Sequence, residues 1–246
     1  MTANTLLSNR FDALMFLIGK VLRFLFFLSL IWALFQDTSN FLGYDRWEFI
    51  LIFLTFNVVD LMAQVLFRGV YFFPEQVIKG NFDFSLVKPM SSLFAALARL
   101  DPLDTLFIAP IFGFTIYAIF QIPDLTFVRV VSYVFFLIFG VAISTSFHVI
   151  SAATTIHYPD NNGFIWAYRE IFGLSRFPQE TFPTMLRTVF TFVVPAFIIA
   201  TYPVKVLLGR LSLPYALLGA LYGIVFFGAS LLLWRWSLKK YSSASS

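Results

Sequence analysis

The stretch GNFDFSLVKP, Gly80–Pro89, interrupts a chain that is otherwise almost continuously apolar. It lies within a charged segment, Arg68–Arg99, and a long hydrophobic run stands on each side of that segment. Glycine, asparagine and proline break regular structure, and the charged side chains need water or a polar partner. The pattern predicts a water-exposed loop between two membrane-spanning helices, through which a soluble partner acts on the rest of the chain.

Composition sets the class of protein. Of the 246 residues, 59% are hydrophobic and only 12% are charged, with a mean hydropathy of +0.84. Soluble domains carry about 25% charged residues, and so few charges cannot cover a water-soluble fold. The 34 phenylalanines suit helix surfaces in lipid. The chain has no cysteine, which excludes disulfides and thiolate metal sites.

Apolar runs divide the chain into membrane spans. Each run is close to the roughly 20 residues that cross a bilayer core of about 30 Å. We expect an all-α integral membrane protein, a single transmembrane domain over residues 1–246, with six spans at about 15–35, 47–67, 102–120, 130–152, 185–203 and 213–234.

Basic residues indicate the orientation of the spans. With the N-terminus inside, the outer side holds only four of the 17 lysines and arginines, namely Arg46, Arg129, Lys205 and Arg210. Cytoplasmic loops are enriched in lysine and arginine. The distribution therefore predicts cytoplasmic N- and C-termini, and it assigns the basic pI to topology and lipid contact, with no nucleic-acid partner.

Two segments before the last span are unusual. Pro195 and Pro203 interrupt the fifth run, which leaves two alternatives: a kinked helix, or a span that ends early and is followed by a re-entrant element over about Pro195–Leu213. Upstream, Asn162–Phe172 carries an aromatic face beside the charged pair Arg169–Glu170. That pattern predicts an amphipathic helix lying in the inner interface.

Motifs of soluble enzymes are absent. The chain contains no phosphate-binding G-x-x-x-x-G-K-[ST], no G-x-S-x-G and no H-E-x-x-H. One alternative is a lipid-modifying enzyme that uses His148, His157 and Asp160 near the inner end of the fourth run. Nine residues separate the histidines, so on one continuous helix they would face opposite sides.

Asn57, Asp60 and Gln64 form a polar face on the second span, because their spacing places them on one side of a helix. A carboxylate near mid-bilayer costs on the order of 3 kcal/mol, so this face should point away from lipid. The sequence leaves two roles open: a hydrogen-bonded seam between helices, or the lining of a substrate path. Proton-driven transport through Asp60 is a further alternative, weakened by the lack of midspan charges on other helices.

The central loop contains a predicted short helix. Phe73-Pro74-Glu75-Gln76 resembles a helix start, with proline in the first turn and an acid behind it. We expect a helix over Pro74–Lys79 that ends at Gly80-Asn81, and Lys88-Pro89 should prevent a further helix. A short, capped, charged helix is a suitable docking element.

Three stretches resemble a known family. The first contains Gly80, Phe82, Asp83, Leu86, Lys88 and Pro89; the second is Arg176–Gly209, an Arg-aromatic-Pro start followed by a Thr-x-x-x-Pro run; the third is Lys240-Tyr241-Ser242-Ser243-Ala244. Together, over about residues 10–245, they resemble the permeases of ABC-2 type transporters, in the six-span bacterial group formerly called a domain of unknown function.

This resemblance implies a function and a set of partners. Such permeases pair with an identical or homologous second permease in the bacterial plasma membrane, and they are driven by two separate cytosolic ATPase subunits. The permease binds no cofactor; ATP and Mg²⁺ belong to the ATPase. The resemblance also implies a re-entrant element before the sixth span, outward transport, and a coupling helix between spans two and three, with Pro74, Glu75, Lys79, Gly80 and Asp83 as the coupling residues.

Overall fold

The computed structural model describes residues 10–159 and 163–241 and is all-helical, with 79% helix and no β-strand in the described ranges. Five helical segments are long and apolar enough to cross a membrane: Ala13–Leu34, Arg46–Ile78, Pro102–Phe120, Phe127–His157 and Leu213–Lys239. Each overlaps a span expected from the sequence. A multi-pass helical membrane protein is therefore confirmed.

The principal helices are α2 (Arg10–Leu34), α3 (Arg46–Phe67), α8 (Ile108–Phe120), α9 (Phe127–His157), α10 (Gly163–Phe172), α11 (Thr184–Phe192), α12 (Ala196–Leu207) and α13 (Leu213–Lys239). Shorter elements connect them: η1 (Arg68–Tyr71), α4 (Phe73–Ile78), α5 (Asn81–Leu86), α6 (Ser92–Leu97), α7 (Pro102–Thr105), η2 (Gly173–Arg176) and η3 (Gln179–Thr181).

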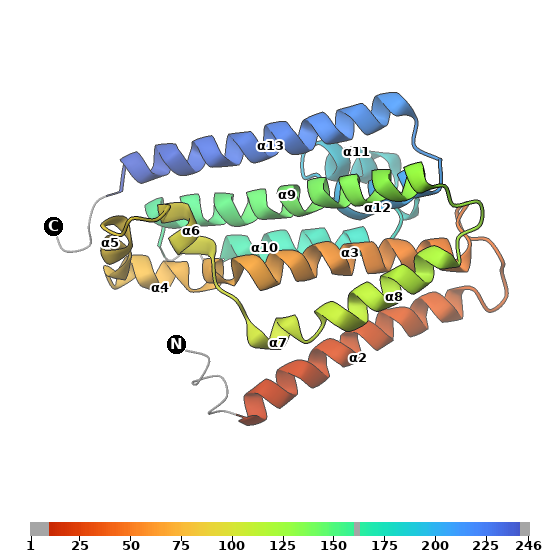
Figure 1. Cartoon of the computed structure of the whole chain (residues 1–246), viewed down its shortest axis with the longest axis horizontal. Helices are drawn as coiled ribbons and strands as arrows, with labels where there is room; N and C mark the ends of the chain where they lie inside the picture. The colour runs from red at the N-terminus through yellow and green to blue at the C-terminus, as the bar shows by residue number, and fades with distance from the viewer. Residues whose placement is uncertain (1–9, 160–162, 242–246) are drawn as a thin grey trace.

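The long helices run side by side, and α4, α5 and α6 lie together at one end of the bundle (Figure 1). We call this the α4–α6 end. The beginning of α2 and the end of α13 lie toward it, whereas the α8–α9 turn lies at the opposite end. Because α9 ends at the α4–α6 end and α13 begins at the opposite one, the chain between them must traverse the bundle.

That traverse is made by α10, η2 and η3, none of which the sequence predicts as a span. Arg169 of α10 pairs with Asp60, in the interior of α3, and Glu180 of η3 contacts Lys205 at the far end. The predicted amphipathic helix thus forms as α10, which packs along α9 (Figure 1) with Ile165, Tyr168 and Phe172 buried and Trp166 exposed. Its expected position in the inner interface stays a prediction.

The segment expected to be a fifth span is not one straight helix. It consists of α11 and α12, which meet at an angle of 96°. The Ser175 hydroxyl donates to the Ala196 carbonyl at the start of α12, and Lys205 near its end pairs with Glu180. Because both helices remain in the half of the bundle away from α4–α6 (Figure 1), the structure agrees with the re-entrant alternative.

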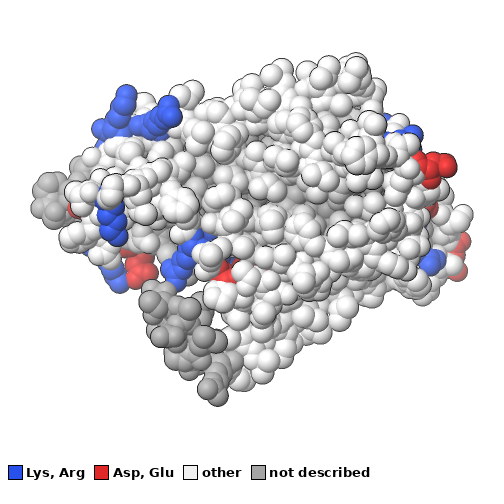
Figure 2. Space-filling view, in the orientation of Figure 1, with Lys and Arg blue, Asp and Glu red and all other residues white. Residues whose placement is uncertain are grey.

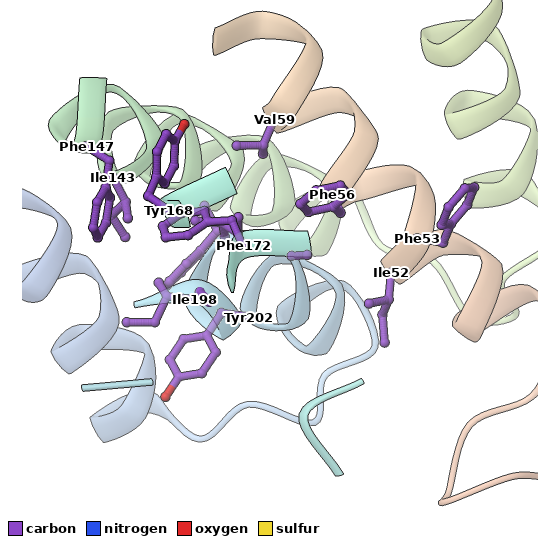
Figure 3. Close-up of a cluster of buried hydrophobic side chains, with 14 of the residues drawn as sticks. Ile52, Phe53, Phe56, Val59, Ile143, Phe147, Tyr168, Phe172, Ile198 and Tyr202 are labelled. Carbon is purple, nitrogen blue, oxygen red and sulfur yellow. The ribbon is translucent and has the colours of Figure 1, made fainter. Parts of the chain in front are cut away.

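The core lies where α3, α9, α10 and α12 meet. Side chains from these helices converge in Figure 3, and Tyr168 and Phe172 of α10 pack on the ring of Phe147, at centroid distances of 5.1 and 4.7 Å. Residues 196–204 of α12 are buried, as is most of α3. The apolar face of α10 thus packs on the core, whereas its charged residue Arg169 pairs with Asp60 and Glu170 is exposed.

Candidate functional site

A half-open cavity of about 310 Å³ lies between α2, α3, the start of α8 and the α10–η2 segment. We call it the α2–α3 cavity. Its walls are mainly apolar and aromatic, and they include Phe24, Phe53, Phe56 and Ile111; Figure 3 labels Phe53 and Phe56 on α3. A volume in this range, with apolar walls and few polar groups, is typical of small-molecule sites.

The polar face predicted on the second span lines this cavity. Asn57, Asp60 and Gln64 are all among its lining residues. The Asn57 amide donates to the Phe53 carbonyl at 2.7 Å, and the Gln64 amide donates to Asp60 Oδ1 at 3.5 Å. These contacts satisfy some of the hydrogen-bonding groups of this polar face. They leave Asp60 Oδ2 available to pair with a cation.

The cation that meets Asp60 comes from α10. Arg169 Nη2 lies 3.5 Å from Asp60 Oδ2, and both side chains are half-buried. Arg176 of η2 and Lys20 and Arg23 of α2 line the same cavity. Sequence reasoning placed these four basic residues in inner loops or near a helix end. The available signal was the spacing of Lys20 and Arg23, which places both on one face of an apolar helix.

A second charged cluster fastens α2 to the bundle. Asp104, whose side chain is fully buried, pairs with Lys20 of α2 and with Arg68 Nη1 at 2.9 Å. Arg68 Nε also lies 3.2 Å from Asp101. Since α2 buries little of its own surface, this network is a principal polar connection between α2, η1 and α7.

The predicted docking helix is present as α4, with Pro74 in its first turn. Glu75 and Lys79 form an exposed ion pair of 2.6 Å along its length. Gly80 follows with a φ of +68°, a left-handed conformation that suits glycine at a helix end. A second helix, α5, begins directly afterwards, before Lys88-Pro89, and the sequence reasoning had not expected it.

Asp83 of α5 connects the α4–α6 end to the last helix. The Tyr241 hydroxyl donates to Asp83 Oδ1 at 2.8 Å, and the Tyr241 ring packs on Phe82. Burial and this hydrogen bond raise the pKa of Tyr241 to about 12, so it remains a donor at physiological pH. Phe82 and Phe73 also contact Trp234 of α13. A displacement of α4 and α5 would therefore act directly on α13.

The opposite end carries its own ion pairs. Lys205 pairs with Glu180 at 2.5 Å, and the Tyr44 hydroxyl donates to the other oxygen of the same carboxylate at 3.0 Å. Burial alone would raise the pKa of Glu180, but the hydrogen bond and charge of Lys205 lower it below its ordinary value. Arg210 binds both oxygens of Glu48. These contacts join the loop before α3 to η3 and α12, and they join the start of α3 to the segment between α12 and α13.

The histidines of the enzyme alternative have separate environments. His148 is fully buried, with Nδ1 2.9 Å from the Ser144 carbonyl and 3.2 Å from the Tyr168 hydroxyl. His157 instead contacts the Ser237 hydroxyl of α13. Asp160 lies outside the described residues. Within residues 10–159 and 163–241, no group of three or more histidine or acidic side chains is placed to hold a metal ion.

Comparison with known proteins gives one result. The family model described as "ABC-2 family transporter protein" matches residues 19–245 of the chain. No curated protein and no solved structure matches. The matched range includes the α2–α3 cavity, the α4–α6 end and the two helices α11 and α12.

Proposed function

The chain belongs to the ABC-2 family of transporter proteins, and from this membership we propose that it is the permease subunit of an ATP-binding cassette exporter. Two such permeases, identical or homologous, would form the path through a bacterial plasma membrane. Two cytosolic ATPase subunits would bind ATP and Mg²⁺ and supply the energy, and the permease itself would need no cofactor.

The α4–α6 end is the observation that best supports this proposal. Apolar side chains are exposed there beside charged ones: Phe84 is 69% and Val87 82% exposed. A polar groove of about 510 Å³ runs between α4, α5 and α6, and Glu75 and Lys79 are among its lining residues. Exposed apolar residues with a charged surround are typical of protein interfaces. We therefore assign Pro74, Glu75, Lys79, Gly80 and Asp83 to the surface that meets the ATPase.

Charge supports a cytoplasmic position for this end. In Figure 2 the charged side chains visible on this face gather toward the two ends of the molecule. Arg187, counted with the inner basic residues in the sequence, belongs to α11 and so moves to the opposite half. Lys79, Lys88, Lys239 and Lys240 remain at or near the α4–α6 end, which agrees with the positive-inside rule.

The proposed mechanism uses the contacts of α5. Closure of the ATPase subunits on ATP would push α4 and α5, and the contacts of Asp83 and Phe82 with Tyr241 would transmit that displacement to α13. Helix movements of this kind alternate the side to which a path opens. Outward transport would follow if ATP binding opens the end that holds α11 and α12.

The test is co-purification with the ATPase from native membranes in mild detergent, combined with an ATPase assay. The double exchange Glu75→Lys with Lys79→Glu keeps the ion pair within α4 and changes helix stability by only a few tenths of a kcal/mol. The exchange places a positive charge at position 75 and a negative charge at position 79, so a docking partner would face each charge with the opposite sign. We expect the exchange to abolish recovery of the ATPase and its activity, with permease yield unchanged.

Arg235→Ala, which removes an exposed charge from α13, is the matched control and should retain the ATPase. Equal recovery with the exchange and with the control would reject α4 as the docking element. Absence of any nucleotide-binding partner from the unmodified permease would reject the exporter itself.

A further inference from the structure

The α2–α3 cavity carries an unbalanced positive charge. Among the described side chains that line it, four are basic, Lys20, Arg23, Arg169 and Arg176, and one is a carboxylate, Asp60. Lys20 is paired with Asp104, and Arg169 is paired with Asp60. In the described part of the chain, neither Arg23 nor Arg176 has a carboxylate within ion-pair distance. The cavity therefore offers two cations that form no ion pair within the described residues.

Arg176 is held in place without being neutralised. Its guanidinium lies over the rings of Phe27 and Phe56, 5.0 and 4.7 Å from their centroids. A β-carbon on Gly173 would lie 2.9 Å from Arg176 Nη1, so the glycine leaves room for this position. Stacking on aromatic faces orients a guanidinium and leaves its charge and its in-plane donors available.

A smaller cavity of about 60 Å³ adjoins the first around the same residues. Arg23, Asp60, Arg169 and Arg176 line both cavities, and Glu170 is added in the smaller one. Arg23 is exposed on α2, whereas Arg176 is half-buried. Arg23 therefore lies at the opening of the site and Arg176 lies deeper. The apolar walls beside them include Phe24, Phe53 and Ile111.

We propose that the α2–α3 cavity binds an anionic amphiphile, with its phosphate or carboxylate group between Arg23 and Arg176 and its apolar chain against the phenylalanine walls. An unneutralised guanidinium in apolar surroundings is costly, and a bound anion removes that cost. Arginine also binds phosphate and carboxylate with two parallel hydrogen bonds. A cationic ligand would meet the net positive charge, since Asp60 already has Arg169 and Gln64 as partners.

The role of this molecule as cargo rests on the proposed transport function, but its binding does not. The experiment therefore measures binding alone, with the purified full-length protein in phosphatidylcholine nanodiscs. The probe is radiolabelled oleoyl-lysophosphatidic acid. Oleoyl-lysophosphatidylcholine has the same chain without the net negative charge, and glycerol 3-phosphate has the same headgroup without the chain.

We expect saturable binding of lysophosphatidic acid and no comparable binding of either comparator. Arg23→Gln and Arg176→Gln should each weaken binding roughly tenfold, the effect of losing a hydrogen bond to a charged group. Arg176→Lys should recover part of the loss, because it retains the charge but not the planar fork. Arg235→Gln is the matched control, since it removes an exposed arginine from α13, outside the cavity, and it should bind as the unmodified protein does.

Asp60→Asn gives a test with the opposite sign. Asp60 is the one carboxylate among the described residues that line the larger cavity, so its removal should tighten binding of lysophosphatidic acid severalfold. Because Arg23 is exposed, Arg23→Gln should fold normally even if Asp60→Asn and the Arg176 variants do not.

Three results would overturn the proposal. Equal binding of lysophosphatidylcholine would show that charge is irrelevant, and equal binding of glycerol 3-phosphate would show a site for free phosphate. Binding by Arg23→Gln equal to that of Arg235→Gln would exclude the arginine pair. The binding assay does not depend on the ATPase, so the two proposals can fail separately. If binding depends on the arginines but no ATPase co-purifies, only the exporter function is rejected. If an ATPase co-purifies but binding does not depend on charge, only the anionic site is rejected.

Discussion

At the residue scale, the buried charges show where this membrane protein depends on ion pairing. Asp104 is fully buried between Lys20 and Arg68, from α2 and η1. Glu75 and Lys79 form a pair that is more than half exposed, within one helix. A buried charge that loses its partner retains the cost of its removal from water, whereas an exposed one regains its hydration.

We predict that Asp104→Asn lowers the free energy of unfolding by about 3 kcal/mol, the low end for a broken buried pair because both cations keep some contact with solvent. Thermal unfolding in detergent is the measurement. Glu75→Gln, which breaks the exposed pair, should cost less than about 0.5 kcal/mol. Similar melting temperatures for the two variants would show that the Asp104 network does not hold α2.

At the element scale, the α4–α6 end depends on a close backbone approach between η1 and α6. A β-carbon at Gly69 would lie 2.6 Å from the carbonyl oxygens of Ala96 and Leu97. These are backbone atoms, so no side-chain rotation relieves the overlap, and α6 would have to move. Gly113 of α8, by contrast, has nothing within 4 Å of the same position.

The two glycines should therefore respond to alanine with opposite signs. Gly69→Ala is expected to destabilise the fold by about 1–3 kcal/mol, as overpacking does. Gly113→Ala should stabilise it by up to about 1 kcal/mol, because alanine favours a helix over glycine. Thermal unfolding of both variants checks the prediction, and a neutral Gly69→Ala would mean that the contact between η1 and α6 yields easily.

At the scale of the whole molecule, the traverse by α10, η2 and η3 changes which residues share a side. The topology expected from sequence places residue 181 with the α4–α6 end, ahead of a span at 185–203. In the structure, η3 contacts Lys205 at the far end through Glu180. Since the chain contains no cysteine, a single introduced cysteine reports its own position without interference.

We predict that Thr181→Cys and Gln121→Cys, the latter in the α8–α9 turn, react with an impermeant maleimide in intact cells, and that Val87→Cys reacts only after permeabilisation. Whether Thr181→Cys behaves like Gln121→Cys or like Val87→Cys tests whether the chain crosses the bundle between α9 and η3. Labelling of Thr181→Cys and Gln121→Cys in intact cells tests whether their end of the bundle faces the outside of the cell. Thr181→Cys grouped with Val87→Cys would restore a straight fifth span.

Much of the fold was determined by local sequence. Apolar runs of sufficient length form α2, α3, α8, α9 and α13, because the bilayer requires backbone groups to bond within the helix. Pro74 and Gly80 delimit α4, since their backbone preferences act within a few residues. The spacing of Asn57, Asp60 and Gln64 places them on one face for the same local reason.

Only the tertiary structure decided which residues pair with the polar face of Asn57, Asp60 and Gln64. It also decided that α10, η2 and η3 carry the chain across the bundle between α9 and α11. Hydropathy is averaged along the sequence, so the charges of Arg169, Glu170 and Arg176 make their segment too polar to be predicted as a span, and its first part is predicted as an interfacial helix instead. Inside the bundle, Asp60 and the aromatic rings of α2 and α3 provide partners for those arginines. The α2–α3 cavity arises from residues far apart in sequence, and a pattern in one segment indicates that a face is buried but not which segment covers it.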